Sequence, residues 1–207
     1  MSLKQTFLQF VNLYTSTAFA NNLWTEVEIT YSQRDRHYHN LTHLENLLHQ
    51  LIQVKTGIAD WNTTLFTLFY HDIVYNPLKN DNEDQSAQLA VQRMRELNLP
   101  PSNIEKCRGQ ILATIGHQVA IDQDTNYFTD ADLSILGADW EVYQQYANNV
   151  RREYSNYPDA VYNLGRAKVL KHFLVMEKIY KTEYFHQRFE VNAKLNLERE
   201  LEYYQQL

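Results

Sequence analysis

The segment TLFTLFYHDIVY, residues 64–75, is apolar on nearly every side of a helix and is followed by Pro77. It predicts a central, buried helix from Trp61 to about Tyr75. His71 and Asp72 lie within this segment, where burial of a charge is costly unless the charge is paired or bound to a metal. The segment alone leaves two interpretations open. Either Asp72 pairs with an arginine beside a core histidine, or both residues bind a metal.

The segments on either side of this helix also indicate helices. Apolar residues at helical spacing predict further helices over about 3–19, 24–31, 42–52, 85–97, 104–115, 130–136, 139–154 and from 159 to the C-terminus. Thr42 and Glu45 match a capping box, whereas 34–40, 78–84 and 117–129 are interpreted as loops. Only five glycines and four prolines are present, which is few for a turn-rich β protein. We therefore predict an all-α fold.

Length and composition indicate a single domain that does not bind nucleic acid. A chain of 207 residues that is 44% hydrophobic can bury one sizeable core, so we expect a single domain over 1–207, with a motif-bearing core at about 34–137 and C-terminal helices at about 139–207. The net charge of −6 argues against binding of a nucleic-acid polymer. With no membrane-spanning apolar run, no signal peptide and only Cys107, we expect a cytoplasmic protein with no membrane contact.

Two further segments concentrate histidine and aspartate. In RHYHNLTHL, residues 36–44, His39 and His43 are four residues apart, so that both imidazoles can approach one point; the alternative is a polar loop that caps a helix. In TDADLSIL, residues 129–136, Asp130 and Asp132 lie at an expected helix start, where an aspartate serves either as a cap or as a ligand.

In chain order these segments resemble the H…HD…D pattern of the HD phosphohydrolase superfamily. YHNLTH, HD and ADLS are similar to the cyclic-nucleotide phosphodiesterase branch. The closer resemblance is to bacterial proteins described as predicted HD-superfamily metal-dependent phosphohydrolases, and it runs from about Arg34 to the end of the chain. The stretches that carry it are RHYHNLTHL, FYHDIVYNP, NEDQSA, DADLSILG, NVRREY and GRAKVL.

This resemblance implies a helical bundle of the HD type and a metal site. The implied ligands are His43, His71, Asp72 and Asp132, and His39 takes the position of the general acid. ADLS favours Asp132, although Asp130 stays open as the last ligand. His117 and Asp130 are the candidates for a second metal or for substrate. Mixed imidazole and carboxylate ligation favours manganese, iron, cobalt, nickel or zinc over magnesium.

The expected function is metal-dependent hydrolysis of a phosphoester in a nucleotide or another small phosphorylated metabolite. We expect Glu83, in the loop after the HD helix, to act as a base or to hydrogen-bond the centre, and Arg36, Arg166 and Lys168 to contact phosphate. Two alternatives are a nucleotide-sensing module without turnover and a di-iron oxygenase on the same helical frame. The tyrosine-rich helices and the tail YYQQL could cover a partner in a homodimer.

Overall fold

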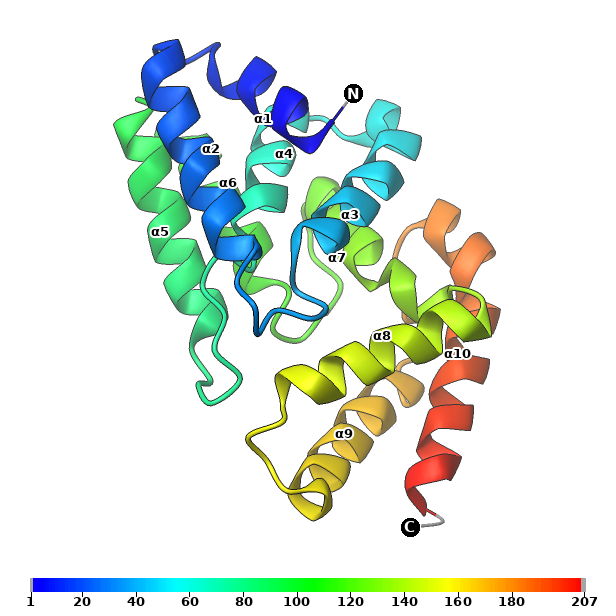
Figure 1. The fold of residues 1–207 in the computed structure, drawn as a ribbon. Coiled ribbons are helices and arrows are strands. Elements are labelled where there is room, and N and C mark those ends of the chain that lie inside the picture. Colours follow the sequence, from blue (N-terminus) through cyan, green and yellow to red (C-terminus); the bar gives the residue numbers. More distant parts are fainter. Residues whose placement is uncertain (1, 206–207) are drawn as a thin grey trace. The chain divides into compact units, whose positions relative to one another are not determined.

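The computed structural model describes residues 2–205, and within them all regular structure is helical (Figure 1). The prediction of an all-α fold is therefore confirmed. The α-helices are α1 (Leu3–Val11), α2 (Thr17–Tyr31), α3 (Leu41–Gln53), α4 (Trp61–Tyr70), α5 (Asn82–Glu96), α6 (Pro101–Leu112), α7 (Gln123–Asp132), α8 (Trp140–Glu153), α9 (Asp159–Leu174) and α10 (Glu183–Gln205), with short 3-10 helices η1 (Lys55–Gly57) and η2 (Leu133–Gly137).

By its internal contacts the chain divides into two compact units. Unit 1 runs up to Thr129 and unit 2 begins at Asp130, so that the boundary falls inside α7. No helix within residues 2–205 is both long and apolar enough to cross a membrane.

Helix α4 forms the centre of unit 1. Asp60 caps it by accepting a hydrogen bond from the Thr63 N–H, and every residue from Thr63 to Tyr70 is buried. Helices α3, α5 and α6 all contact α4. The helix ends at Tyr70, earlier than the predicted Tyr75, and His71 is its C-cap. A core helix therefore delivers His71 from its end and not from its middle.

Helix boundaries near the N-terminus differ from the prediction. The single helix expected up to residue 19 is wrong, because α1 ends at Val11 and α2 begins at Thr17 with Ser16 as its N-cap. The capping box predicted at Thr42 is also wrong. The N-cap of α3 is Asn40, whose Oδ1 accepts hydrogen bonds from the N–H groups of Thr42 and His43. His43 is consequently the third residue of α3.

The segment predicted as a loop over 117–129 contains most of helix α7, so this prediction is wrong. The helix was missed because it buries polar residues, which give it no apolar stripe: Asp124, Thr125, Asn126, Thr129 and Asp130. Asp130 and Asp132 accordingly lie at a helix end and not at the predicted helix start.

Tertiary bonds fix the beginning of α7 within unit 1. The Asp124 carboxylate accepts hydrogen bonds from the backbone N–H groups of Ala59 and Asp60, each at 2.8 Å, and pairs with the Lys106 ammonium. The Tyr127 ring lies so close to Gly57 that a Cβ at Gly57 would come within 2.7 Å of the tyrosine hydroxyl. A buried carboxylate and a close backbone approach therefore hold this helix.

Unit 2 packs α10 against α9 and η2. A buried ion pair joins Arg166 of α9 to Glu200 of α10, with donor–acceptor distances of 2.8 and 2.9 Å. Gly137 of η2 packs closely against Phe189 of α10. A Cβ at position 137 would come within 2.6 Å of the Phe189 backbone oxygen. The helices predicted over 139–154 and from 159 onward correspond to α8, α9 and α10.

Candidate metal centre

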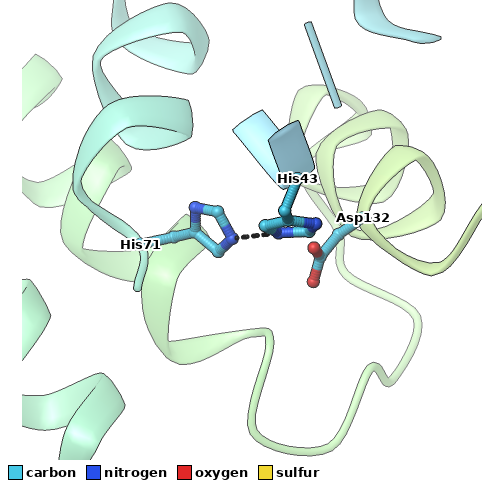
Figure 2. Close-up of side chains that lie close together, drawn as sticks. All are labelled: His43, His71 and Asp132. Atoms are coloured by element: carbon cyan, nitrogen blue, oxygen red, sulfur yellow. Dashed lines mark hydrogen bonds between the residues drawn. The ribbon is translucent and has the colours of Figure 1, made fainter. Parts of the chain in front are cut away.

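Three helix termini bring the predicted ligands His43, His71 and Asp132 together (Figure 2). His43 is in the first turn of α3, His71 caps the end of α4, and Asp132 is the last residue of α7. One potential ligand atom from each lies within 4.8 Å of the others. Both histidines are buried and Asp132 is half-buried. Within residues 2–205 these three residues form a group that could hold a metal ion.

A hydrogen bond fixes the tautomer of His71. Its Nδ1 lies 2.9 Å from the Leu68 carbonyl oxygen. A carbonyl can only accept, so Nδ1 carries the proton and donates. In the neutral imidazole Nε2 then presents a lone pair, which is the form that binds a metal. The last turn of α4 thus orients Nε2 of His71 toward His43.

The two imidazoles are spaced as ligands of a common ion. Nε2 of His43 and Nε2 of His71 are 3.2 Å apart, and Figure 2 shows the two rings turned toward each other. Two nitrogens that each lie about 2.0–2.1 Å from one ion are ~2.9 Å apart at a right angle and ~3.4 Å apart at a tetrahedral angle. The observed separation falls between these limits, so the nitrogen pair fits a transition-metal ion.

Asp72 adds a carboxylate beside both imidazoles. Its Oδ2 lies 3.0 Å from Nε2 of His71 and 3.7 Å from Nε2 of His43. The side chain is about one-fifth exposed, whereas His71 is almost fully buried. Two imidazole nitrogens and a carboxylate oxygen therefore converge, and either a proton, as in the hydrogen bond between His43 and His71, or a bound cation holds them together. The donor set fits a divalent ion.

His39 lies beside these ligands on the loop before α3. Its ring stacks on Tyr75 with centroids 4.2 Å apart, and its centroid is 6.0 Å from that of His43. The ring is half-buried. The structure thus places the predicted acid next to a predicted ligand, with an aromatic ring as its support. The sequence interpretation did not identify Tyr75, because one tyrosine among 15 carries no distinguishing pattern.

Asp130, the other aspartate of the third segment, is engaged elsewhere. Its carboxylate accepts hydrogen bonds from the backbone N–H groups of Lys181 and Thr182 and from the Thr182 hydroxyl, and it lies 3.3 Å from the Lys181 ammonium. Burial raises the pKa of the Asp130 carboxyl and lowers the pKa of the Lys181 ammonium. Asp130 is therefore a structural residue of unit 2, and Asp132 is the aspartate that joins the histidines.

The predicted phosphate contacts differ in how far their charges are already engaged. Arg36 is buried, and its guanidinium donates to backbone carbonyls. Arg166 is buried against Glu200. Lys168 is exposed on α9. Of these residues, Lys168 alone has its charged group in solvent; the roles of all three as phosphate contacts stay predictions.

The sequence predicts that Glu83 and His117 lie in loops. Glu83 instead lies in the first turn of α5, where an acidic side chain favours helix formation. The loop location predicted for it is wrong, while its role stays a prediction. His117 follows α6 with a positive φ of 49° and is half-buried. It does not belong to the three-residue metal group.

The sequence interpretation also missed Asp124, which anchors the helix that carries Asp132. Asp124 lies in the segment predicted as a loop, where an acidic residue is common and carries no distinguishing signal. Comparison of the chain with protein-family models, with curated proteins and with solved structures found no match.

Proposed function

We propose that this chain is a metal-dependent phosphohydrolase of the HD type. One observation carries the proposal: two buried imidazole nitrogens from separate helices face each other at 3.2 Å, with carboxylates beside them. The metal would be held by His43, His71, Asp132 and Asp72. Such a mixed nitrogen and oxygen donor set suits manganese, iron, cobalt, nickel or zinc.

A divalent ion bound there would lower the pKa of water and polarise a phosphoryl oxygen. The protein's own residues supply the arrangement around it. The Leu68 carbonyl fixes the tautomer of His71. The Asp72 carboxylate lies beside both imidazoles, where it would orient a water molecule by accepting a hydrogen bond from it. These side chains are positioned before substrate arrives, which favours catalysis by preorganisation.

His39 is the proposed proton donor to the leaving oxygen. An imidazole that titrates near neutrality suits this role, and stacking on Tyr75 limits its rotation. His39 and Asp72, both half-buried, mark the side of the centre at which a substrate would enter. We propose a nucleotide or another small phosphorylated metabolite as substrate, because the net charge of −6 disfavours a polymeric polyanion.

The test separates metal binding from proton donation. Wild-type protein loaded with manganese, nickel or cobalt is expected to hydrolyse both a p-nitrophenyl phosphoester and phosphorylated metabolites, and chelation is expected to stop this. His71→Ala is expected to lose both bound metal and activity. His39→Ala is expected to keep its metal while kcat on an alkyl phosphoester falls by about 10²- to 10⁴-fold, the usual contribution of a general acid.

The leaving group provides an internal control for His39. Because p-nitrophenolate leaves without protonation, His39→Ala is expected to lower kcat much less on the p-nitrophenyl ester than on the alkyl ester. Metal content is measured by elemental analysis of the same samples. Unchanged metal content and unchanged activity in both His71→Ala and Asp72→Ala would refute the proposed function.

A further inference from the structure

A single buried side chain ties the His39 loop to the segment that carries His71 and Asp72. The Arg36 guanidinium donates through Nη1 to the His39 carbonyl at 3.2 Å and to the Asp72 carbonyl at 2.7 Å, and through Nη2 to the Ile73 carbonyl at 2.8 Å. Arg36 and Asp72 are 36 positions apart in the chain. These bonds therefore join the backbone next to the proposed acid to the backbone at the proposed ligands.

Two tyrosine rings that flank Arg36 connect the same segments a second time. The guanidinium carbon lies 4.8 Å from the Tyr31 ring centroid and 5.6 Å from that of Tyr75. The Tyr31 hydroxyl accepts a hydrogen bond from the Asp72 N–H, and the Tyr75 ring stacks on His39. Movement of Arg36 would consequently disturb both the ring that supports His39 and the peptide on either side of Asp72.

The geometry of these bonds calls for an arginine. A guanidinium offers donors in a fixed planar fork, so that one group can reach three carbonyls, whereas the ammonium of lysine is a single point on a flexible stem. The arrangement has a cost, because Nε of Arg36 is buried and has no hydrogen-bond partner within residues 2–205. The side chain is only 5% exposed. An arginine that contacts phosphate from the surface would not need to be buried to this extent.

We propose that Arg36 is a positioning residue of the metal centre. Its guanidinium holds the His39 loop at a fixed distance from the His71–Asp72 turn, and so aligns both the proton donor and the ligands. This rests on the proposed function, and it replaces the predicted phosphate contact at this position. Outer groups that orient metal ligands typically change metal affinity or activity by about 10- to 100-fold when they are removed.

Unit 2 contains a matched control. Arg151 donates to the carbonyls of Tyr154 and Tyr157, at 2.9 and 3.1 Å, and its guanidinium carbon lies 4.6 Å from the Tyr162 ring centroid. It also pairs with the exposed Asp159. Arg151 thus braces a loop through the same kinds of contact as Arg36, but these contacts include none of the proposed ligands.

The experiment titrates metal-free protein with Co²⁺ and follows binding by calorimetry and by the visible spectrum of the bound ion. Arg36→Met and Arg36→Lys are expected to bind Co²⁺ about 10- to 100-fold more weakly and to shift the spectrum, because the ligands lose alignment. Arg151→Met is expected to match wild type in both readouts. Adding guanidinium ion at millimolar concentration to Arg36→Ala is expected to restore part of the affinity.

The outcomes separate this inference from the proposed function. If His71→Ala abolishes Co²⁺ binding while folded Arg36→Lys keeps wild-type affinity and spectrum, the positioning role is wrong and the metal centre stands. If His71→Ala binds Co²⁺ as wild type does, the proposed function itself fails. Arg36→Lys keeps the charge and most of the side-chain volume, so it serves as the test if Arg36→Met does not fold.

Discussion

Asp132→Asn is expected to weaken divalent-metal binding by more than about 100-fold, since the loss of a direct ligand should exceed the loss of an outer hydrogen-bond partner. Asparagine has the same shape but lacks the charge that a divalent ion attracts. The side chain is half-buried at the end of α7, so the free energy of unfolding of the metal-free protein should change by less than about 1 kcal/mol.

Asp130→Asn is the matched control, and the opposite result is expected for it. The change leaves the Lys181 ammonium buried without its carboxylate and weakens the hydrogen bonds from the Lys181 and Thr182 backbone. Removing one partner of a buried ion pair costs about 3–5 kcal/mol, which corresponds to a fall in Tm of roughly 6–20 °C for a protein of this size. Metal affinity of the folded variant should stay within a few-fold of wild type.

Calorimetric titration with Mn²⁺ measures the metal affinity of each variant, and thermal unfolding of the metal-free protein measures its stability. The assignment of Asp132 as ligand is wrong if Asp130→Asn loses the metal and Asp132→Asn keeps it. A loss of metal in both variants, with both still folded, would indicate that the whole segment must be intact and would remove the distinction drawn between the two aspartates.

Asp124→Ala is expected to lower both stability and metal affinity. The change leaves the part-buried N–H groups of Ala59 and Asp60 without their acceptor and Lys106 without its closest carboxylate. We expect a loss of about 3–5 kcal/mol in unfolding free energy. Metal affinity should fall as well, because Asp124 fixes the beginning of the helix whose last residue is Asp132.

Asp122→Ala controls for the general effect of removing an acidic residue from this helix start. Asp122 accepts a hydrogen bond from the Thr125 N–H and lies 3.2 Å from Lys106, but its side chain is 44% exposed. The expected cost is that of a lost helix cap, about 1 kcal/mol, with little change in metal affinity. If chemical denaturation shows equal losses for Asp122→Ala and Asp124→Ala, the anchoring role of Asp124 is contradicted.

Helix α4 could be predicted from the sequence because its residues are apolar on nearly every side, as a buried helix requires. A helix surrounded by apolar residues has to lie in the core, and a histidine and an aspartate at its end therefore stand out. His43 and Asp132 were not indicated by burial; they were predicted because the three segments, in chain order, resemble the H…HD…D pattern. The structure confirms that His43, His71 and Asp132 form a group that could hold a metal ion.

Helix α7 could not be predicted in the same way. Its buried face carries Asp124 and Asp130, which bind groups 65 and 51 positions away in the chain, and Asn126, which binds the backbone of Ala120 in the preceding loop. Hydropathy periodicity cannot detect a helix whose inner face is polar, because the compensating hydrogen bonds exist only in the folded chain. For this reason Asp132 was predicted at a helix start and lies at a helix end.

The basic residues show what a sequence pattern leaves open. Phosphate contact by Arg36 and Arg166 stays a prediction, and the structure adds that both side chains are buried, one against backbone carbonyls and the other against Glu200. An arginine has the same sequence pattern whether it binds a ligand or braces the fold. Only the neighbours supplied by distant segments distinguish the two uses, and these depend on tertiary structure.

The most direct measurement is anomalous X-ray diffraction from crystals grown with Mn²⁺ or Zn²⁺. We predict one strong anomalous peak about 2.0–2.3 Å from Nε2 of His43, from Nε2 of His71 and from a carboxylate oxygen of Asp132. Imidazoles that point to separate places, with no peak between them at saturating metal, would contradict the metal centre and the function proposed from it.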